Sequence, residues 1–406
     1  MKKMLCFSLL AGVLSCLWIF SGGASAAPRS IGGFSKQIYQ SSDLDRDARG
    51  EYELLAMKWA GLVVNEEIRR DYPLLSKALM EFNRGEQQRI RKVRWELNRD
   101  AADFRRENPL DYHPFGCGFD VQVCRADTLV FSFLQKNYTN GSGAHGLYDW
   151  QGVNYNTLTG TKISLSSVIT DENALVEAIC QRLRQGYPQS QFDNLEETIK
   201  ACIAEDKLNW SLDPRGVTFY FNPYEIASYA EGLLTATILF AERPDLFTGY
   251  YSQTAKTYAQ PFDAAYALIT SLKDDERRDV IAVEGGAETV RVTVNGMTKA
   301  VAGQLTDLQP VLVHMEDGRN YLYIDGQSPD SSRQTMVIQL GRNTIRCIDT
   351  LPFSFRHTEA VSPAVIESWQ FLTNPEGFYF DRSGSFTSTT QTDICAIGEK
   401  GELTFG

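Results

Sequence analysis

Side chains that commonly perform acid–base or metal chemistry are scarce in this chain. Its histidines are His113, His145, His314 and His357. The sequence has no H-E-x-x-H or H-x-x-x-H zinc pattern, no G-x-S-x-G nucleophile turn and no S-x-x-K pair. We therefore expect a protein without enzymatic activity, metal site or cofactor. One alternative is an envelope hydrolase without a recognisable motif, in which Asp149 or Glu225 acts as acid or base. The other is a structural scaffold whose β domain mediates assembly.

His145 is the one histidine embedded in a glycine-rich stretch, which runs from Thr139 to Gly160. Glycines allow positive φ and close backbone approach, so the stretch predicts a shaped loop and hairpin. Two interpretations of His145 remain open. A structural histidine, hydrogen-bonded within the hairpin, is the commoner one, and a histidine that contacts a ligand is the other.

A second candidate surface follows a predicted strand at Val217–Phe221. Pro223 fixes a bend there, and Tyr224 and Tyr229 are rigid, amphipathic side chains that lose little entropy on binding. The same tyrosines could equally be packed in the core. The sequence thus indicates a recognition patch but does not decide between contact and packing.

These two stretches carry a family resemblance. The pattern S-G-A-H-G followed by N-Y-N-T-L-T-G-T-K-I-S-L, and later G-V-T-F-Y-F-N-P-Y-E-I-A, resembles the extracellular domain of RsiV-type, lysozyme-sensing anti-sigma factors. The same module accompanies the catalytic domain of PdaC-type peptidoglycan deacetylases. The resemblance covers roughly residues 55 to 245. Nothing in the chain resembles the deacetylase domain, so that activity is not transferred.

The resemblance implies a recognition domain whose partner is a lysozyme-like cationic protein or peptidoglycan. In the sensors, the glycine loop and the Pro-Tyr segment take part in lysozyme recognition. Ser228 and Glu231 depart from the family pattern, which places a proline and a small residue there. The candidate binding residues carried over are Ser142, His145, Tyr148, Pro223, Tyr224 and Tyr229.

Charge and the N-terminus narrow the class of protein. Acidic residues number 51 and basic residues 40, so nucleic acid and anionic membrane are poor partners and a cationic partner is favoured.

Residues 1–26 read as a secretory signal peptide that ends in Ala24-Ser25-Ala26. Lipid anchoring at Cys16 is a less favoured alternative. Since no other segment has the ~20 apolar residues of a membrane span, we expect an exported protein in the periplasm, cell envelope or medium.

Six cysteines remain after signal-peptide cleavage. An even number in an exported chain favours disulfide bonds, although sequence alone cannot select the pairing. The simplest expectation joins neighbours, 117 with 124, 180 with 202 and 347 with 395. The candidate disulfide residues are Cys117, Cys124, Cys180, Cys202, Cys347 and Cys395.

Hydrophobic periodicity predicts an α+β fold in two domains. Residues 27–53 form a linker whose Asp43, Asp45 and Asp47 could instead begin a calcium loop. Residues 54–245 form an α+β domain with an antiparallel sheet and packed helices. A linker with a short helix covers 246–278, and 279–406 is an all-β domain, a sandwich, meander or partial propeller. The predicted elements of the first domain are a strand at Leu54–Val64, a long helix after Pro73, strands at Cys117–Cys124 and Asp127–Leu134, helices capped by Asp171 and Asp193, and strands at Leu208–Leu212, Val217–Phe221 and Leu233–Phe240.

Overall fold

The computed structural model describes residues 27–47, 50–143, 145–354, 356–362, 364–380, 393–398 and 400–405. The predicted signal peptide at 1–26 and the alternative anchor Cys16 lie outside the described residues. Within the described part, no helix is both long enough and apolar enough to cross a membrane. The fold is α+β, with an N-terminal α+β region and a β-rich C-terminal region, as the sequence predicted.

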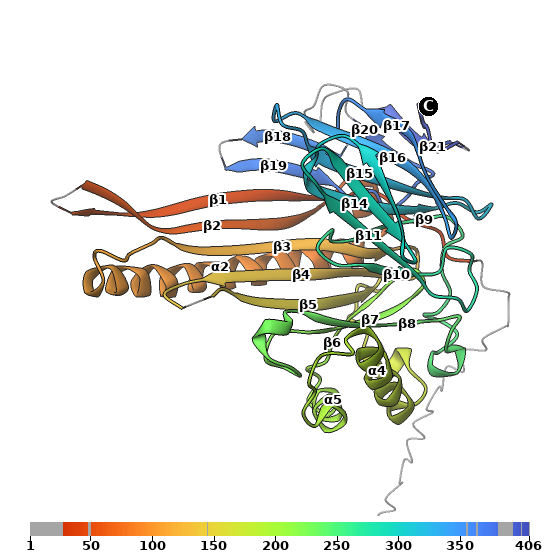
Figure 1. Ribbon diagram of the computed structural model, residues 1–406, viewed down its shortest axis with the longest axis horizontal. Coiled ribbons are helices and arrows are strands. Elements are labelled where there is room, and N and C mark those ends of the chain that lie inside the picture. The colour runs from red at the N-terminus through yellow and green to blue at the C-terminus, as the bar shows by residue number, and fades with distance from the viewer. Residues whose placement is uncertain are drawn as a thin grey trace, which may run out of the picture.

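The largest sheet has seven strands in the order β18-β19-β1-β2-β3-β4-β5 (Figure 1). Neighbouring strands are antiparallel except β2 and β3, which run parallel. The long strands β1 and β2 project, together with α2, away from the C-terminal region (Figure 1). The strand bounds are β1 Phe34–Asp47, β2 Gly50–Val64, β3 Phe115–Ala126, β4 Val130–Asn140, β5 Leu147–Asn156, β18 His357–Ser362 and β19 Val365–Gln370.

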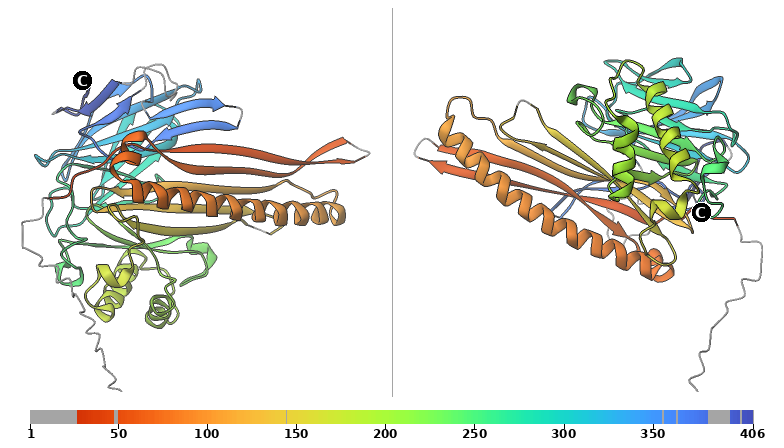
Figure 2. Two further views of the ribbon diagram at one scale, coloured as in Figure 1. Left: turned by 180° about the vertical axis from the view of Figure 1, so that it is seen from behind. Right: turned by 90° about the horizontal axis from the view of Figure 1, so that it is seen from below.

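One face of this sheet is covered by α2, Pro73–Glu107, which runs along its length (Figure 2). The short α1, Glu66–Asp71, precedes it and is capped by Asn65, whose Oδ1 accepts from Ile68 N at 3.0 Å. The predicted apolar stripe is confirmed, since Leu75, Leu79, Ile90 and Ala101 are buried. The helix continues through Gly85.

The predicted linker at 27–53 is wrong, because β1 and the beginning of β2 occupy it. Alternate residues of a strand point the same way, and Asp43 and Asp45 both face α2. Asp43 forms an ion pair with Arg94 at 2.5 Å, and Asp45 pairs with Arg105. The pKa of Asp43 is lowered, chiefly by its hydrogen bond with Arg94. The acidic run therefore secures the hairpin to the helix.

A second layer, below the large sheet in Figure 1, joins helices to a three-stranded sheet in the order β6-β7-β8. One hydrophobic core, which includes Leu175, Ile199 and Phe219, holds it together. Asp171 caps α4 as predicted, accepting from the backbone N–H groups of Asn173 and Ala174. Asp193 does not cap α5, whose N-cap is Asn194 in the left-handed conformation. The bounds are α3 Leu165–Val168, α4 Glu172–Gly186, α5 Leu195–Ala204, β6 Asn209–Leu212, β7 Gly216–Phe221, η1 Tyr229–Glu231, β8 Leu234–Leu239 and η2 Pro244–Leu246.

The C-terminal region is a sandwich of two antiparallel sheets. A four-stranded sheet, β10-β11-β12-β13, and a five-stranded sheet, β17-β16-β15-β14-β9, share one core that includes Val292 and Leu322. A small sheet, β20-β21-β22, follows. The bounds are β9 Tyr258–Pro261, β10 Leu268–Thr270, β11 Asp279–Gly285, β12 Thr289–Val294, β13 Met297–Ala302, β14 Thr306–His314, β15 Asn320–Gln327, β16 Arg333–Gly341, β17 Thr344–Leu351, β20 Phe378–Phe380, β21 Asp393–Ile397 and β22 Leu403–Phe405.

The predicted domain boundaries need two corrections. The expected linker with a short helix at 246–278 contains β9 and β10, which belong to the sandwich, and no helix occurs in 247–278, all of which is described. The chain then returns to the first sheet, because β19 pairs with β1. The two regions are therefore interleaved along the sequence.

Two of the predicted disulfide pairs are wrong, since Cys117, Cys124, Cys180 and Cys202 are free thiols. The third pair, 347 with 395, stays a prediction, because the side chain of Cys395 lies outside the described part. Cys117 and Cys124 sit seven residues apart on the continuous strand β3, about 23 Å at ~3.3 Å per residue, whereas a disulfide needs Cα atoms within about 7 Å. Cys180 and Cys202 contribute to the helical core as small apolar side chains.

Candidate recognition surface

The glycine-rich stretch forms the β4–β5 hairpin and its turn. Tyr138 pairs with Tyr148 across the two strands, and their rings lie 4.9 Å apart. A Cβ at Gly146 would lie 2.3 Å from the Tyr138 ring, so a larger residue there would force that ring to move. Ser142 and His145 are exposed on the turn. The local sequence thus builds a hairpin that presents His145 outward.

Asn222 holds the Pro-Tyr segment against this hairpin. β5 is the edge strand of the large sheet, so one side of its backbone needs other partners. Asn222 supplies them, accepting from Trp150 N at 2.7 Å and donating to Trp150 O at 3.3 Å. Glu225 in turn accepts from the Asn222 backbone N–H at 2.8 Å. The side chains of two loop residues therefore lock the segment in place.

Tyr224 follows in an unusual conformation, with φ at +73° and 62% of the residue exposed. Positive φ is uncommon for a residue with a bulky side chain, and such positions concentrate at functional sites. Pro223, immediately before it, is half-buried. The backbone here turns the tyrosine ring outward rather than into the core.

The two segments meet in an aromatic cluster of His145, Tyr224 and Tyr229. The His145 and Tyr229 rings stack at 3.6 Å with an interplanar angle of 16°. Tyr229 donates its hydroxyl hydrogen to Gly146 O at 2.6 Å, and Tyr224 Oη lies 3.5 Å from His145 Nε2. The Tyr224 and Tyr229 rings are 5.6 Å apart. Residues 79 positions apart in sequence thus share one exposed face.

Three carboxylates near these segments in sequence are held by hydrogen bonds. Asp149 accepts from Asn137 Nδ2 and from Gln151 Nε2, each at 3.1 Å. Glu225 accepts from both nitrogens of Asn222. Glu231 accepts from Ser190 Oγ at 2.7 Å. These contacts fix the orientation of the acidic groups.

The remaining histidines lie in other parts of the fold. His314 is buried, with Nδ1 2.7 Å from Asn320 Oδ1 and its ring stacked on Tyr258. His357 pairs with Glu367, whose pKa is lowered to about 2 mainly by that contact. His113 packs near Phe104 at the far end of α2. Among the described residues, no group of three or more His, Cys, Asp or Glu side chains is placed to hold a metal ion.

Sequence reasoning missed an open groove beside Tyr148, on the sheet face opposite α2. Its volume is about 560 Å³. Tyr148 is 46% exposed and lines this groove instead of joining the stacked cluster. The signal that could have found the groove is the spacing of Gly118 and Asp120, because alternate residues of one strand share a face.

Comparisons with known proteins add a family match for part of the chain. Residues 167–241 match the model of a family described as "Protein of unknown function (DUF3298)". No curated protein matches the sequence. Among solved structures, a member of the DUF3298 family from Bacteroides fragilis NCTC 9343 is similar at 15% identity and a TM-score of 0.38, over 55% of this chain and 98% of that chain. A DUF3298 family protein from Pseudomonas aeruginosa PAO1 has 15% identity and a TM-score of 0.35, over 53% and 95%. The stretch from α3 to β8, which supplies Pro223, Tyr224 and Tyr229, is thus similar to the DUF3298 family.

Proposed function

We propose that this chain is an exported, non-catalytic binding protein that docks a cationic, lysozyme-like protein through the aromatic cluster. The observation that carries the proposal is the His145–Tyr229 stack, which fuses the glycine loop and the Pro-Tyr segment into one exposed face. These are the two segments used for lysozyme recognition in the sensors that the sequence resembles. The residues 142 to 148 and 223 to 229 are the expected contact region.

The geometry suits protein recognition because the cluster is already ordered. Clustered tyrosines are frequent anchors of protein interfaces, and a pre-organised anchor loses little entropy on binding. Tyr224 is held by the Asn222 clamp next to it and by its neighbour Tyr229. A partner with a shallow pocket could therefore receive Tyr224 without rearranging the loop.

The electrostatics favour a basic partner. The chain has a formal net charge of −11, and without Lys2 and Lys3 the balance is 38 basic to 51 acidic residues, or −13. Glu225 and Glu231 add negative charge close in sequence to Tyr224 and Tyr229. Such complementarity mainly accelerates association and selects partners. Since exposed charges are screened over about 8 Å at physiological ionic strength, binding should weaken with salt.

The test is binding to an immobilised C-type lysozyme at low and moderate salt. Tyr224→Ala removes the more exposed of the two tyrosine rings in the cluster. We expect the affinity to fall by at least ~30-fold, which corresponds to the loss of about 2 kcal/mol typical of an interface hot spot. Tyr250→Ala is the matched control, because Tyr250 is 44% exposed and contacts Tyr251 outside the cluster. Failure of the wild-type protein to bind at either salt concentration would reject a lysozyme-like partner.

A second candidate ligand is peptidoglycan. The observation that favours it is the groove next to Tyr148, which the aromatic cluster does not fill. Co-sedimentation with purified peptidoglycan measures this binding separately from lysozyme binding. If the groove binds peptidoglycan, Tyr224→Ala should leave the fraction of protein in the pellet unchanged. A pelleted fraction no larger than that of a non-binding protein would remove this candidate.

A further inference from the structure

The groove floor is one continuous face of the large sheet. The pairing of Lys58 with Gly118, Gly118 with Tyr138 and Tyr138 with Tyr148 places these residues in one row across four strands. A parallel row contains Asp120, Lys136 and Trp150. Paired residues in a sheet share a face, and all of these residues line the groove. The floor therefore carries aromatic rings at one end of these rows and polar groups at the other.

Gly118 makes the groove deep at its centre. A Cβ at Gly118 would meet no heavy atom within 4 Å, so open space lies directly above the β3 backbone. Gly116, two residues earlier on the same strand, does not line the groove, and a Cβ there would make only an ordinary contact with Asn140 at 4.0 Å. The missing side chain of Gly118 thus creates a trough between Lys58 and Tyr138.

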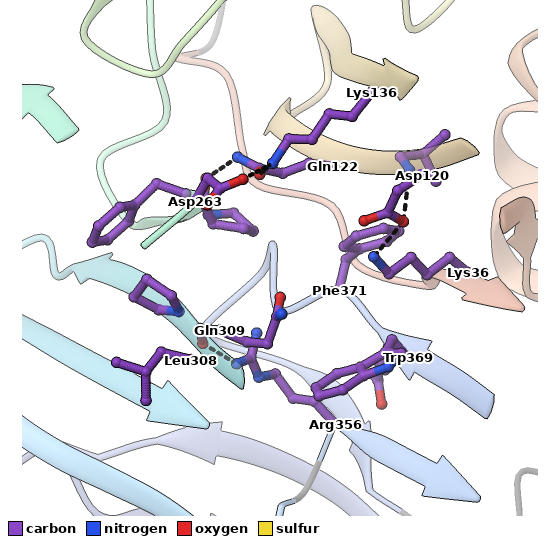
Figure 3. A pocket seen from close by; sticks show the side chains of 15 residues that line it. Lys36, Asp120, Gln122, Lys136, Asp263, Leu308, Gln309, Arg356, Trp369 and Phe371 are labelled. Carbon is purple, nitrogen blue, oxygen red and sulfur yellow. Dashed lines mark hydrogen bonds and ion pairs between the residues drawn. The ribbon is translucent and has the colours of Figure 1, made fainter. Parts of the chain in front are cut away.

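The inner end of the groove is walled by charged groups that are already paired. Lys36 bonds Asp120 at 2.6 Å, and Lys136 bonds Asp263 at 2.7 Å. Figure 3 shows an adjoining pocket that shares these pairs with the groove, and there they face Gln309 and Arg356 across an open space. Each ammonium group of this wall thus lies beside a carboxylate.

We infer that this groove binds a short, uncharged oligosaccharide. Ammonium and carboxylate groups that are already paired offer hydrogen-bond donors and acceptors, and the ligand needs no charge of its own to bind them. Such a lining suits a polyhydroxyl ligand better than an anion or a cation. The rings of Tyr138 and Tyr148 offer flat apolar surfaces for the C–H faces of sugar rings. The volume of about 560 Å³ lies within the ~300–1,000 Å³ of typical small-ligand sites. The inference names the ligand class of the peptidoglycan candidate above and is independent of the lysozyme-like partner.

The test uses N-acetylchitotetraose and cellotetraose in titration calorimetry with the full chain. Gly118→Val fills the trough, and we expect it to weaken binding at least tenfold. Gly116→Val is the matched control, on the same strand and face but outside the groove, and should bind like the wild type. Both substitutions add a β-branched residue within a strand, which favours the strand, and circular dichroism melts check that the fold is intact.

The outcomes are distinct. Binding of either tetrasaccharide that is lost in Gly118→Val and kept in Gly116→Val and Tyr224→Ala supports the groove as the site. Absence of binding by both sugars at millimolar concentration overturns the inference, as does binding that Gly118→Val leaves unchanged. Because Tyr224 lies outside the groove, lysozyme binding can fail while sugar binding persists, and the reverse.

Discussion

Asp213 provides the sharpest physical test of the fold, because it is a carboxyl group buried next to neutral partners. It is 6% exposed and accepts hydrogen bonds from the hydroxyls of Thr218 and Ser211. Burial raises its pKa from 3.8 to about 7, against the opposing effects of those hydrogen bonds and the charge of Arg125. The folded protein therefore holds a proton at Asp213 that the unfolded chain releases.

The magnitude follows from this difference in pKa. The pKa of Asp213 is about three units higher in the folded state than in the unfolded state. Each unit of this difference corresponds to about 1.4 kcal/mol of stability. Up to ~4 kcal/mol of stability is therefore present below pH 4 and is lost as the pH rises through about 7. The sign is opposite to that of a carboxylate stabilised by an ion pair.

Asp213→Asn should remove this dependence, because asparagine stays neutral and can donate to the hydroxyl oxygens of Thr218 or Ser211. We expect the variant to gain stability relative to the wild type between pH 4 and 8, by as much as ~4 kcal/mol. Urea unfolding followed by tryptophan fluorescence at several pH values measures the difference. The exposed Asp193→Asn variant controls for the lost charge.

Two results would refute the reasoning. If the free-energy difference between Asp213→Asn and the wild type stayed constant from pH 4 to 8, Asp213 would not be neutral in the folded protein. If the variant instead lost stability as the pH rose, the carboxylate would be the stabilised form. A parallel change in Asp193→Asn would assign the effect to net charge.

The remaining predictions concern the parts that build the recognition surface. Gly152→Ala should prevent folding or lower the melting temperature steeply, because a Cβ there would lie 1.8 Å from Trp210 O. The control variant Gly118→Ala has open space above the backbone and should melt like the wild type. Asn222→Ala should lower the unfolding free energy in urea by ~1–3 kcal/mol, because the edge groups of Trp150 lose both partners; an unchanged value would contradict the clamp. Tyr229→Phe keeps the stack on His145 but loses the hydrogen bond to Gly146 O. We therefore expect the affinity for lysozyme to fall about threefold to tenfold, which corresponds to a loss of ~1 kcal/mol. A loss as large as that of Tyr224→Ala would show that the hydroxyl group does more than hold the loop.

Local patterns predicted much of the first region correctly. The stripe from Leu75 to Ala101 predicted α2, and Asp171 marked the start of α4. The strand predicted at Val217–Phe221 is likewise confirmed as β7. These elements depend on interactions between residues close in sequence, which periodicity and capping describe directly.

The errors share one physical cause. The segment at 34–47 is polar because its acidic side chains pair with basic side chains of α2, so it resembles a linker in sequence. The cysteine pairing used distance along the chain, whereas the seven-residue span of β3 separates Cys117 from Cys124 in space. Likewise, nothing near residue 365 signals that β19 returns to β1. Each feature depends on a distant partner.

The same division applies to the candidate site. The residue types alone predicted the glycine loop that exposes His145 and the proline bend before Tyr224. Both predictions were possible because backbone freedom and ring rigidity are local properties. Only the tertiary structure decided that these segments stack on each other at 3.6 Å and that Gly118 opens a groove beside them. Both depend on which strands become neighbours in the sheet, and that choice is made by long-range pairing and core packing rather than by any single stretch of sequence.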